Sequence, residues 1–238
     1  MKILLTNDDG IESKGLLLIA KWAVKHGEVL IAAPLHQQSG TSQAIEIHEP
    51  FIVKKVAYQI DVPAYAVDST PADCVRFATA ALDFEPDLII SGVNCGFNVG
   101  VDIVYSATVG AIFEGATSGY QGLAISTHPE SFDDAEAHLD EVWDYIMTRD
   151  LFSKNDLYNV NIPVSPKRIL MTKQAGPYYR DKFRNVGDDL YIADGYSIYK
   201  GTSNLDLDLD AVMNGYISIT PLTLNRTASV YDELKDEQ

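Results

Sequence analysis

Residues 1–10 read M-K-I-L-L-T-N-D-D-G, and this opening stretch decides the expected fold of the chain. Residues 2–6 are a short apolar run of strand length, and the turn residues that follow end it. A buried strand therefore brings Asp8 and Asp9 to its carboxyl end. Open α/β sheets bind their ligands at that edge. The stretch thus predicts a carboxylate pair at the binding edge of a sheet.

Two adjacent carboxylates repel each other, and one is driven toward its protonated form unless a cation neutralises the pair. Ligands that offer only oxygen suit Mg²⁺, Mn²⁺ or Ca²⁺ better than zinc. The same letters also fit a solvated Asp-Asp-Gly turn, because Asp-Gly turns are common. This stretch alone leaves the metal site and the plain turn as equal alternatives.

The next residues complete a strand-helix-strand unit. Residues 15–26 are rich in Leu and Ala and predict a helix that Gly27 ends. Residues 28–33 are a second apolar strand, which Pro34 closes. Such a unit of about thirty residues indicates a parallel α/β sheet with right-handed crossovers. The polar loop 35–42 then lies at the same sheet edge as the two aspartates.

Further alternation of strands and helices extends this sheet. The segment 44–65 alternates apolar and polar residues and predicts strands or a hairpin. Thr70, Pro71 and Asp73 are typical of a helix start. We expect later strands at 64–67, 87–91, 122–126, 157–162, 168–172 and 216–220, and helices from about 71 to 82, 105 to 120 and 133 to 149.

A glycine- and asparagine-rich loop is expected at 92–102, directly after a buried strand. Glycine permits close backbone approach to a ligand, and asparagine supplies a neutral oxygen and amide donors. Ser106 and Thr108 follow at a helix start, where free N–H groups and the helix dipole favour phosphate. These residues also fit ordinary N-capping, but the loop before them favours a phosphate site.

Composition narrows the classes of partner. The 238 residues carry 18 basic and 34 acidic side chains, a net charge of −16, which argues against a nucleic-acid polymer or an anionic membrane as partner. Cys74 and Cys95 are far apart and form no CxxC pair, so neither a disulfide framework nor a zinc site is indicated. The start is too short for a signal peptide, and no apolar run has transmembrane length. We expect a cytoplasmic protein.

The character of the chain changes at 176–201, where five tyrosines lie among charges and turn pairs. This pattern predicts an antiparallel excursion from the main sheet, used as a subunit contact or a lid. It also fits an ordinary β-subdomain, and the two interpretations are compatible. Asp206, Asp208 and Asp210 alternate with leucines after it. Such an acidic run is usually a solvated surface, and we expect one here.

The expected strand ends bring four polar stretches together. Asp8 and Asp9 with the oxygens of Ser39 and Asn94 would form a shell for a hard divalent metal, open to water and substrate. Asn98 and the helix start at 106–108 supply donors for a phosphoryl group. A water activated by the metal is the natural nucleophile, with Asp8 or Asp9 as its general base. The set predicts hydrolysis of phosphomonoesters.

The same residues carry a family resemblance. The chain resembles the SurE family, the stationary-phase survival proteins, over nearly its whole length. The matching stretches are T-N-D-D-G (6–10), A-P-x-x-x-x-S-G (33–40), S-T-P-A-D-C-V (69–75), S-G-V-N-C-G-x-N-x-G-x-D (91–102), Y-S-A-T-V-G-A (105–111) and G-Y-I-S-I-T-P-L (215–222).

This resemblance implies a Rossmann-like α/β core, residues 1–172, and an extension, 173–238, whose hairpin and helix exchange between subunits of a homodimer or homotetramer. It also implies a 5′/3′-nucleotidase, with some members acting on short polyphosphate, and one divalent ion per subunit, Mg²⁺ or Mn²⁺, or Ca²⁺ in a crystal. The implied metal ligands are Asp8, Asp9, Ser39 and Asn94, and the implied phosphate contacts are Asn98, Ser106, Ala107 and Thr108.

Three positions depart from the family pattern. Ala107 stands where the family usually has glycine, and its methyl group could narrow the phosphate site. Leu35 and His36 replace the more usual Asp-Arg. Two alternatives to a phosphatase remain. One is a receiver-like phosphoacceptor, although the chain is about twice the length of such a domain. The other is a nucleotide-binding protein without catalysis.

Overall fold

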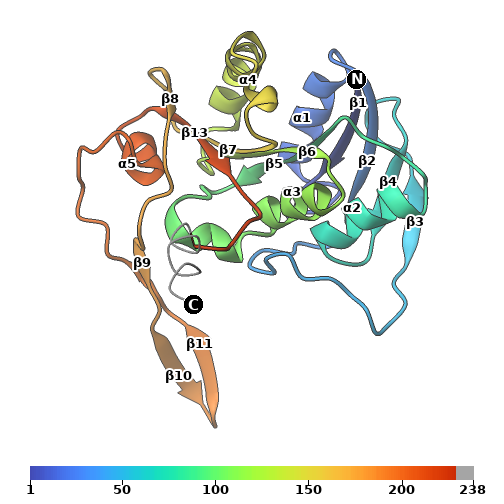
Figure 1. Ribbon diagram of the computed structural model, residues 1–238. Coiled ribbons are helices and arrows are strands. Elements are labelled where there is room, and N and C mark those ends of the chain that lie inside the picture. The colour runs from blue at the N-terminus through green and yellow to red at the C-terminus, as the bar shows by residue number, and fades with distance from the viewer. Residues whose placement is uncertain (229–238) are drawn as a thin grey trace, which may run out of the picture.

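The computed structural model describes residues 1–228 and contains a nine-stranded sheet with helices on both faces (Figure 1). The strand order is β3-β4-β2-β1-β5-β6-β7-β13-β8. The strands are β1 (Lys2–Thr6), β2 (Glu28–Pro34), β3 (Val53–Val56), β4 (Ala64–Val67), β5 (Leu88–Cys95), β6 (Gln121–Thr127), β7 (Leu157–Ile162), β8 (Ile169–Met171) and β13 (Ile217–Leu222).

Most of the sheet is parallel, which confirms the predicted fold class. Strands β4, β2, β1, β5, β6 and β7 run in one direction, whereas β3 and β13 pair antiparallel with β4 and β7. The chain leaves β1 to pair β2 on one side and later returns to pair β5 on the other. This reversal makes the carboxyl ends of β1 and β5 the switch point at which such sheets bind ligands.

Helices cover both faces of the sheet (Figure 1). Helices α1 (Lys14–Ala23) and α4 (Phe132–Thr148) pack with Ile3 and Leu5 in one hydrophobic cluster. Helices α2 (Pro71–Ala80) and α3 (Ala107–Thr117) pack with Leu4 in the other. Successive side chains of β1 thus enter opposite clusters, which is why this strand reads as one continuous apolar run.

The helices begin where the sequence indicates. Thr70 is the N-cap of α2 and its side chain accepts from Asp73 N, with Pro71 in the first helical position, as predicted. Ser106 caps α3 in the same way by accepting from Val109 N. These caps satisfy backbone N–H groups that the first turn of a helix otherwise leaves unpaired.

The segment before β3 differs from the prediction. Residues 44–52 form no strand, and β3 begins only at Val53. Hydrogen bonds to the start of α2 hold this segment instead: Thr70 Oγ1 donates to Ala44 O at 2.7 Å, and Glu46 N donates to Asp73 Oδ2 at 2.8 Å. Alternation of residue types was a misleading signal here, because side chains of α2 take the backbone groups that a strand partner would use.

Strand β5 also differs, because it continues to Cys95 where a loop was expected from residue 92. Its register against β6 shifts between Ser91 and Asn94, a bulge that lets the strand carry on. Gly92 permits this shift with a φ of 138°, and a Cβ there would lie 2.2 Å from Ile125 O. The strand therefore delivers Asn94 itself to the sheet edge.

The antiparallel excursion after residue 176 is confirmed. Strands β9 (Tyr179–Arg180) and β12 (Tyr196–Ser197) pair with each other, and β10 (Phe183–Gly187) pairs with β11 (Leu190–Ala193). Figure 1 shows this arm extending away from the sheet. The chain then forms α5 (Asp208–Met213) and returns through β13 between β7 and β8. The division of the chain at residue 172 stays a prediction, and its last part, 229–238, lies outside the described residues.

The prediction that the acidic run 206–210 is exposed to solvent is wrong for Asp208 and Asp210. Asp208 is 1% exposed and Asp210 is 2% exposed, and both belong to α5. Their carboxylates accept hydrogen bonds from neighbouring N–H and hydroxyl groups, which replace the lost water.

Over residues 1–228, the helices are all too short or too polar to cross a membrane.

Candidate active site

A cavity of about 210 Å³ lies at the carboxyl ends of β1, β2 and β5. Its wall includes Asp8, Ser39, Asn94, Asn98 and Ser106, which come from separate stretches of the sequence. The structure therefore brings five of the eight candidate residues to one cavity. Asp9, Ala107 and Thr108 do not contribute to its wall.

The Asp8 carboxylate is almost completely buried, with 4% of the residue exposed. Burial raises the pKa of Asp8 to about 6, the hydrogen bond from Thr108 lowers it, and the charge of Asp9 raises it further. Thr108 Oγ1 donates to Asp8 Oδ1 at 2.6 Å. Burial also raises the pKa of Asp9, whose Oδ2 accepts from Cys95 N at 3.1 Å. A cation beside this pair would offset both effects.

Ser39 and Asn94, which carry neutral oxygens, line the same cavity as Asp8. The loop that carries Ser39 is fixed to the end of β1, because Gln38 N donates to Asp8 O at 2.7 Å. Asn94 Nδ2 donates to Gly96 O at 2.7 Å. Since the amide N–H of Asn94 is used in this way, its carbonyl oxygen is the atom that it can offer to a cation.

Asn98 is held from the sheet below. Its side-chain Nδ2 donates to Ser126 Oγ at 2.8 Å, and its backbone N donates to Asn161 Oδ1 at 2.8 Å. Asn98 O accepts from the Nδ2 atoms of Asn159 and Asn161, each at 2.8 Å. An amide NH₂ group has two N–H donors, so one donor of Asn98 stays available for a ligand.

The amino end of α3 lies on the same side of the cavity. Ser106 Oγ accepts from Val109 N at 3.1 Å, which leaves the hydroxyl hydrogen free to donate. The N–H groups of Ala107 and Thr108, the first two residues of α3, have no intrahelical acceptor. The helix dipole adds partial positive charge at this end. Capping and anion binding are therefore compatible functions of the same turn.

Comparison with known proteins now identifies the family. A family model described as "Survival protein SurE" matches residues 3–181. This chain belongs to the SurE family.

Relatives and a solved structure agree with this assignment. A protein named "5'-nucleotidase SurE" from Pseudothermotoga lettingae is 36% identical, covering 94% of this chain and 89% of the relative. Another of that name, from Natranaerobius thermophilus, is 32% identical over 99% and 98%. The crystal structure of SurE from Aquifex aeolicus superimposes with a TM-score of 0.83 at 29% identity and covers 100% and 99% of the two chains. The SurE likeness thus extends over both core and extension.

Sequence reasoning missed several residues in the wall of the cavity of this SurE-family protein. Asp102 and Tyr105 lie in the matching motifs, but the sequence analysis predicts no role for them. It predicts none for Phe97 or Val99 either. Tyr178 reaches the wall from the extension, and its only signal was its place among other tyrosines. Burial and the charges of Asp102 and Asp208 raise the pKa of Tyr178.

The three family departures lie away from the cavity wall. Ala107 is fully buried and does not line the cavity, although its neighbour Ser106 does. Leu35 and His36 are also absent from the wall. An effect of Leu35 or His36 on a ligand in this space would therefore be indirect, whereas the backbone N–H of Ala107 lies at the amino end of α3.

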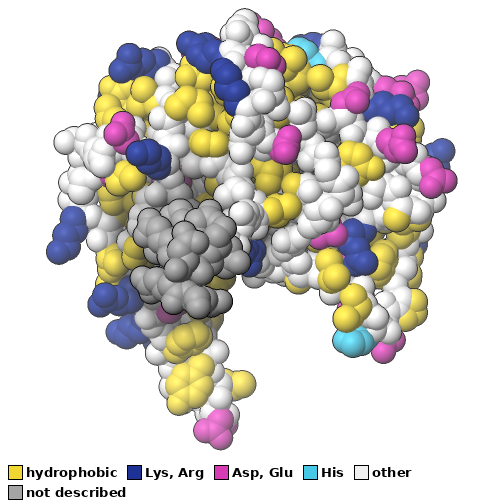
Figure 2. Space-filling model, in the orientation of Figure 1, with side chains coloured by type: hydrophobic (Ala, Val, Ile, Leu, Met, Phe, Trp, Pro, Cys, Tyr) yellow, Lys and Arg dark blue, Asp and Glu magenta, His cyan; other side chains and the backbone are white. Residues whose placement is uncertain are grey.

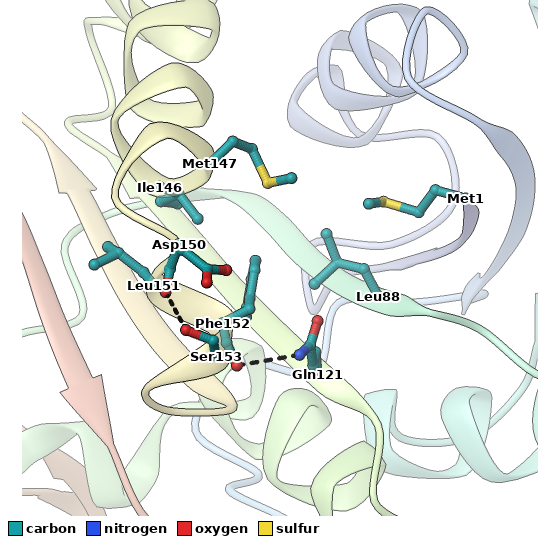
Figure 3. Close-up of a pocket in the computed structure, with 9 residues that line it drawn as sticks. All are labelled: Met1, Leu88, Gln121, Ile146, Met147, Asp150, Leu151, Phe152 and Ser153. Carbon is teal, nitrogen blue, oxygen red and sulfur yellow. Dashed lines mark hydrogen bonds between the residues drawn. The ribbon is translucent and has the colours of Figure 1, made fainter.

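A second cavity, of about 350 Å³, lies at the opposite edge of the sheet (Figure 3). Met1, Leu88 and Gln121 line it from the amino ends of β1, β5 and β6. Figure 3 shows Met147 facing Met1 across the opening, with Gln121 Nε2 donating to Phe152 O at 3.3 Å. Among the described residues, Asp150 is the only carboxylate of this wall, and the larger cavity has no counterpart of the Asn98 and Ser106 donors.

Proposed function

We propose that this SurE-family protein is a divalent-metal-dependent phosphomonoesterase that hydrolyses nucleoside 5′- and 3′-monophosphates to nucleoside and phosphate. The observation that carries this proposal is a single cavity that combines buried carboxylate chemistry with the amino end of α3. Family membership supports the reaction class, because the relatives described above bear the name 5'-nucleotidase.

The donor set fits a hard divalent cation, one per subunit. Asp8, Asp9, Ser39 and Asn94 would hold it through oxygen atoms, which suits Mg²⁺ or Mn²⁺, or Ca²⁺ in a crystal. Within residues 1–228, no group of three or more His, Cys, Asp or Glu side chains is arranged to hold a metal. The proposed site therefore uses the aspartate pair and neutral oxygens. Because burial disfavours the ionised form of Asp8, a cation beside it would stabilise the carboxylate.

When bound, the ion would polarise the phosphoryl group and lower the pKa of a water molecule. The residues of the chain orient the reactants. The free N–H of Asn98, the Ser106 hydroxyl and the first N–H groups of α3, from Ala107 and Thr108, would donate to phosphoryl oxygens and meet the charge that grows on them during displacement. Thr108 also fixes the Asp8 carboxylate through its hydroxyl. Asp8 or Asp9 would accept the proton of the attacking water as general base.

The partners proposed for this activity are small phosphomonoesters. A net charge of −16 disfavours a nucleic-acid polymer or an anionic membrane surface as a partner. We place the protein in the cytoplasm and propose a homodimer or homotetramer as its working form.

Purified protein stripped with a chelator and then reloaded tests the proposal. We expect no release of p-nitrophenol from p-nitrophenyl phosphate without metal, and multiple turnovers after addition of Mn²⁺ or Mg²⁺. AMP and 3′-AMP should then both release phosphate. Turnover that is indifferent to the chelator would contradict the metal dependence.

Two outcomes would favour the alternatives. Labelling of the protein by one phosphoryl group without turnover would indicate a receiver-like phosphoacceptor. Binding of AMP with no phosphate release would indicate a nucleotide-binding protein. Asp8→Asn is the control in both assays, because it removes one carboxylate without changing the size of the side chain.

A further inference from the structure

The loop of residues 97–100, which carries Asn98, is held from two sides. The asparagines of β7 hold it on the side of the sheet, as described above. On its other side, Gly100 N donates to Asp208 Oδ2 at 2.9 Å, and Gln174 Nε2 donates to Gly100 O at 3.0 Å. Both of these partners belong to the extension after residue 172. The loop is therefore fixed between the sheet and the extension.

Asp208 joins three segments with one carboxylate. Besides Gly100, its Oδ1 accepts from Ala175 N at 2.8 Å and from Leu209 N at 2.7 Å. Asp208 is 1% exposed and is the first residue of α5. A buried carboxylate is tolerated only when its oxygens are hydrogen-bonded in this way. The arrangement ties the segment that leads into the arm, the start of α5 and loop 97–100 to one another.

Hydrophobic packing also connects loop 97–100 to the extension. Val99 lies in a small hydrophobic cluster whose other buried members, Ala175, Leu209 and Val212, all come from the extension. Gly100 has a φ of +62°, and a Cβ there would lie 2.8 Å from Gly176 O. Loop and extension thus approach as closely as their backbones allow. The extension forms the rear support of the loop that carries Asn98.

We propose that Asp208 is a positioning residue, which fixes loop 97–100 so that Asn98 and Ser106 meet the phosphoryl group in the geometry that catalysis needs. Asp208 acts through Gly100, since it is not part of the cavity wall. Gly100 opens the 3₁₀ helix η1 (Gly100–Tyr105), which leads directly to Ser106. The inference rests on the proposed phosphatase function and adds to it a role for the extension.

Asp210 provides a matched control on the same helix. It is 2% exposed, and its carboxylate accepts from Tyr199 Oη at 2.5 Å and from the Thr202 hydroxyl. Its partners all lie within the extension, so Asp210→Asn disturbs α5 without touching loop 97–100. Asp208→Asn instead removes the charge and turns an amide NH₂ toward backbone N–H donors.

The test compares kcat for p-nitrophenyl phosphate and the Mn²⁺ concentration that gives half-maximal activity. We expect Asp208→Asn to lower kcat by about tenfold, because small misplacement of a positioning group is costly in rate. The Mn²⁺ requirement should change less than about twofold, since Asp208 contacts none of the proposed metal ligands. Asp210→Asn should keep kcat within about twofold of the wild type, even if it lowers the unfolding temperature as much as Asp208→Asn does. Equal kcat in the two variants would overturn the proposal.

Gln174→Ala keeps the test decisive if Asp208→Asn does not fold. Gln174 is exposed, and its removal leaves the buried cluster intact. We expect a lower kcat with an unchanged unfolding temperature, and an unchanged kcat would count against the proposal.

Amide hydrogen exchange separates this inference from the phosphatase function. Gly100 N–H should exchange faster in Asp208→Asn but not in Asp210→Asn, even if the wild-type protein hydrolyses no ester. Equal exchange in both variants would overturn the positioning role.

Discussion

Asp8 combines an unfavourable environment with a central place in the cavity. Burial raises its pKa to about 6, so the ionised carboxylate is disfavoured in the folded chain by an energy of order 2–3 kcal/mol. Thr108 compensates only in part through its hydrogen bond. A buried carboxylate with a raised pKa in a cavity is more typical of groups that bind a ligand than of structural ones.

Asp8→Asn should therefore stabilise the metal-free protein at neutral and alkaline pH. The folded-state pKa is raised, so the wild-type protein loses stability as the pH rises from about 4 to about 6, whereas the neutral amide does not. Thermal unfolding in chelator should show the variant melting above the wild type at pH 8 and close to it at pH 4. Saturating Mn²⁺ should reverse the order, because only the wild type gains binding energy. A variant that melts lower than the wild type in chelator at pH 8 would contradict this account.

At the scale of the element, local signals predicted the sheet well. The apolar runs of β1, β2, β6 and β7 and the cap at Thr70 depend on near neighbours in the sequence, and all are found where expected. The bulge that extends β5 was not predicted, because glycine in a strand and glycine in a loop give the same letters. Nor were the supports of Asn98: Asn159 and Asn161 lie 61 and 63 residues away, and only pairing of β5, β6 and β7 brings them near.

Close packing of α1 against β5 also depends on one small residue. A Cβ on Gly15 would lie 1.9 Å from Val93 O, directly before the proposed metal ligand Asn94. Gly15→Ala should lower the free energy of unfolding by about 1–3 kcal/mol, despite the better helix propensity of alanine. It should also raise the Mn²⁺ concentration needed for half-maximal activity, because β5 must shift.

Gly176→Ala is the control for this change. Among residues 1–228, no heavy atom beyond its chain neighbours lies within 4 Å of the position that its Cβ would take, and we expect unfolding in urea to be unchanged. An unfolding midpoint for Gly15→Ala equal to that of the wild type would show that α1 can move away at no cost.

At the scale of the whole molecule, the extension has two parts with different surroundings. Its root packs on loop 97–100 and places Tyr178 in the cavity wall. Its arm, β9 to β12, projects from the body, and Figure 2 shows hydrophobic side chains along it. Sequence reasoning predicted the arm, because tyrosines and turn pairs are local signals. It did not predict the root, because the buried partners of Asp208 come from a loop that lies 108 residues earlier.

We predict that the hairpin of the arm holds two copies of the chain together. Phe183 and Tyr191 are 65% and 63% exposed, and the pairing of Phe183 with Ala193 and of Asn185 with Tyr191 places them on one face of the hairpin. An isolated two-stranded hairpin is marginally stable in water, so we expect a partner surface to bury that face. The double substitution Phe183→Ser and Tyr191→Ser should convert a dimer or tetramer into a monomer in sedimentation velocity.

Ile47→Ser is the control, because Ile47 is as exposed, at 67%, but lies far from the arm in the sequence and outside its strands. A wild-type protein that sediments as a monomer, or a double variant that sediments like the wild type, would show that the arm serves another purpose.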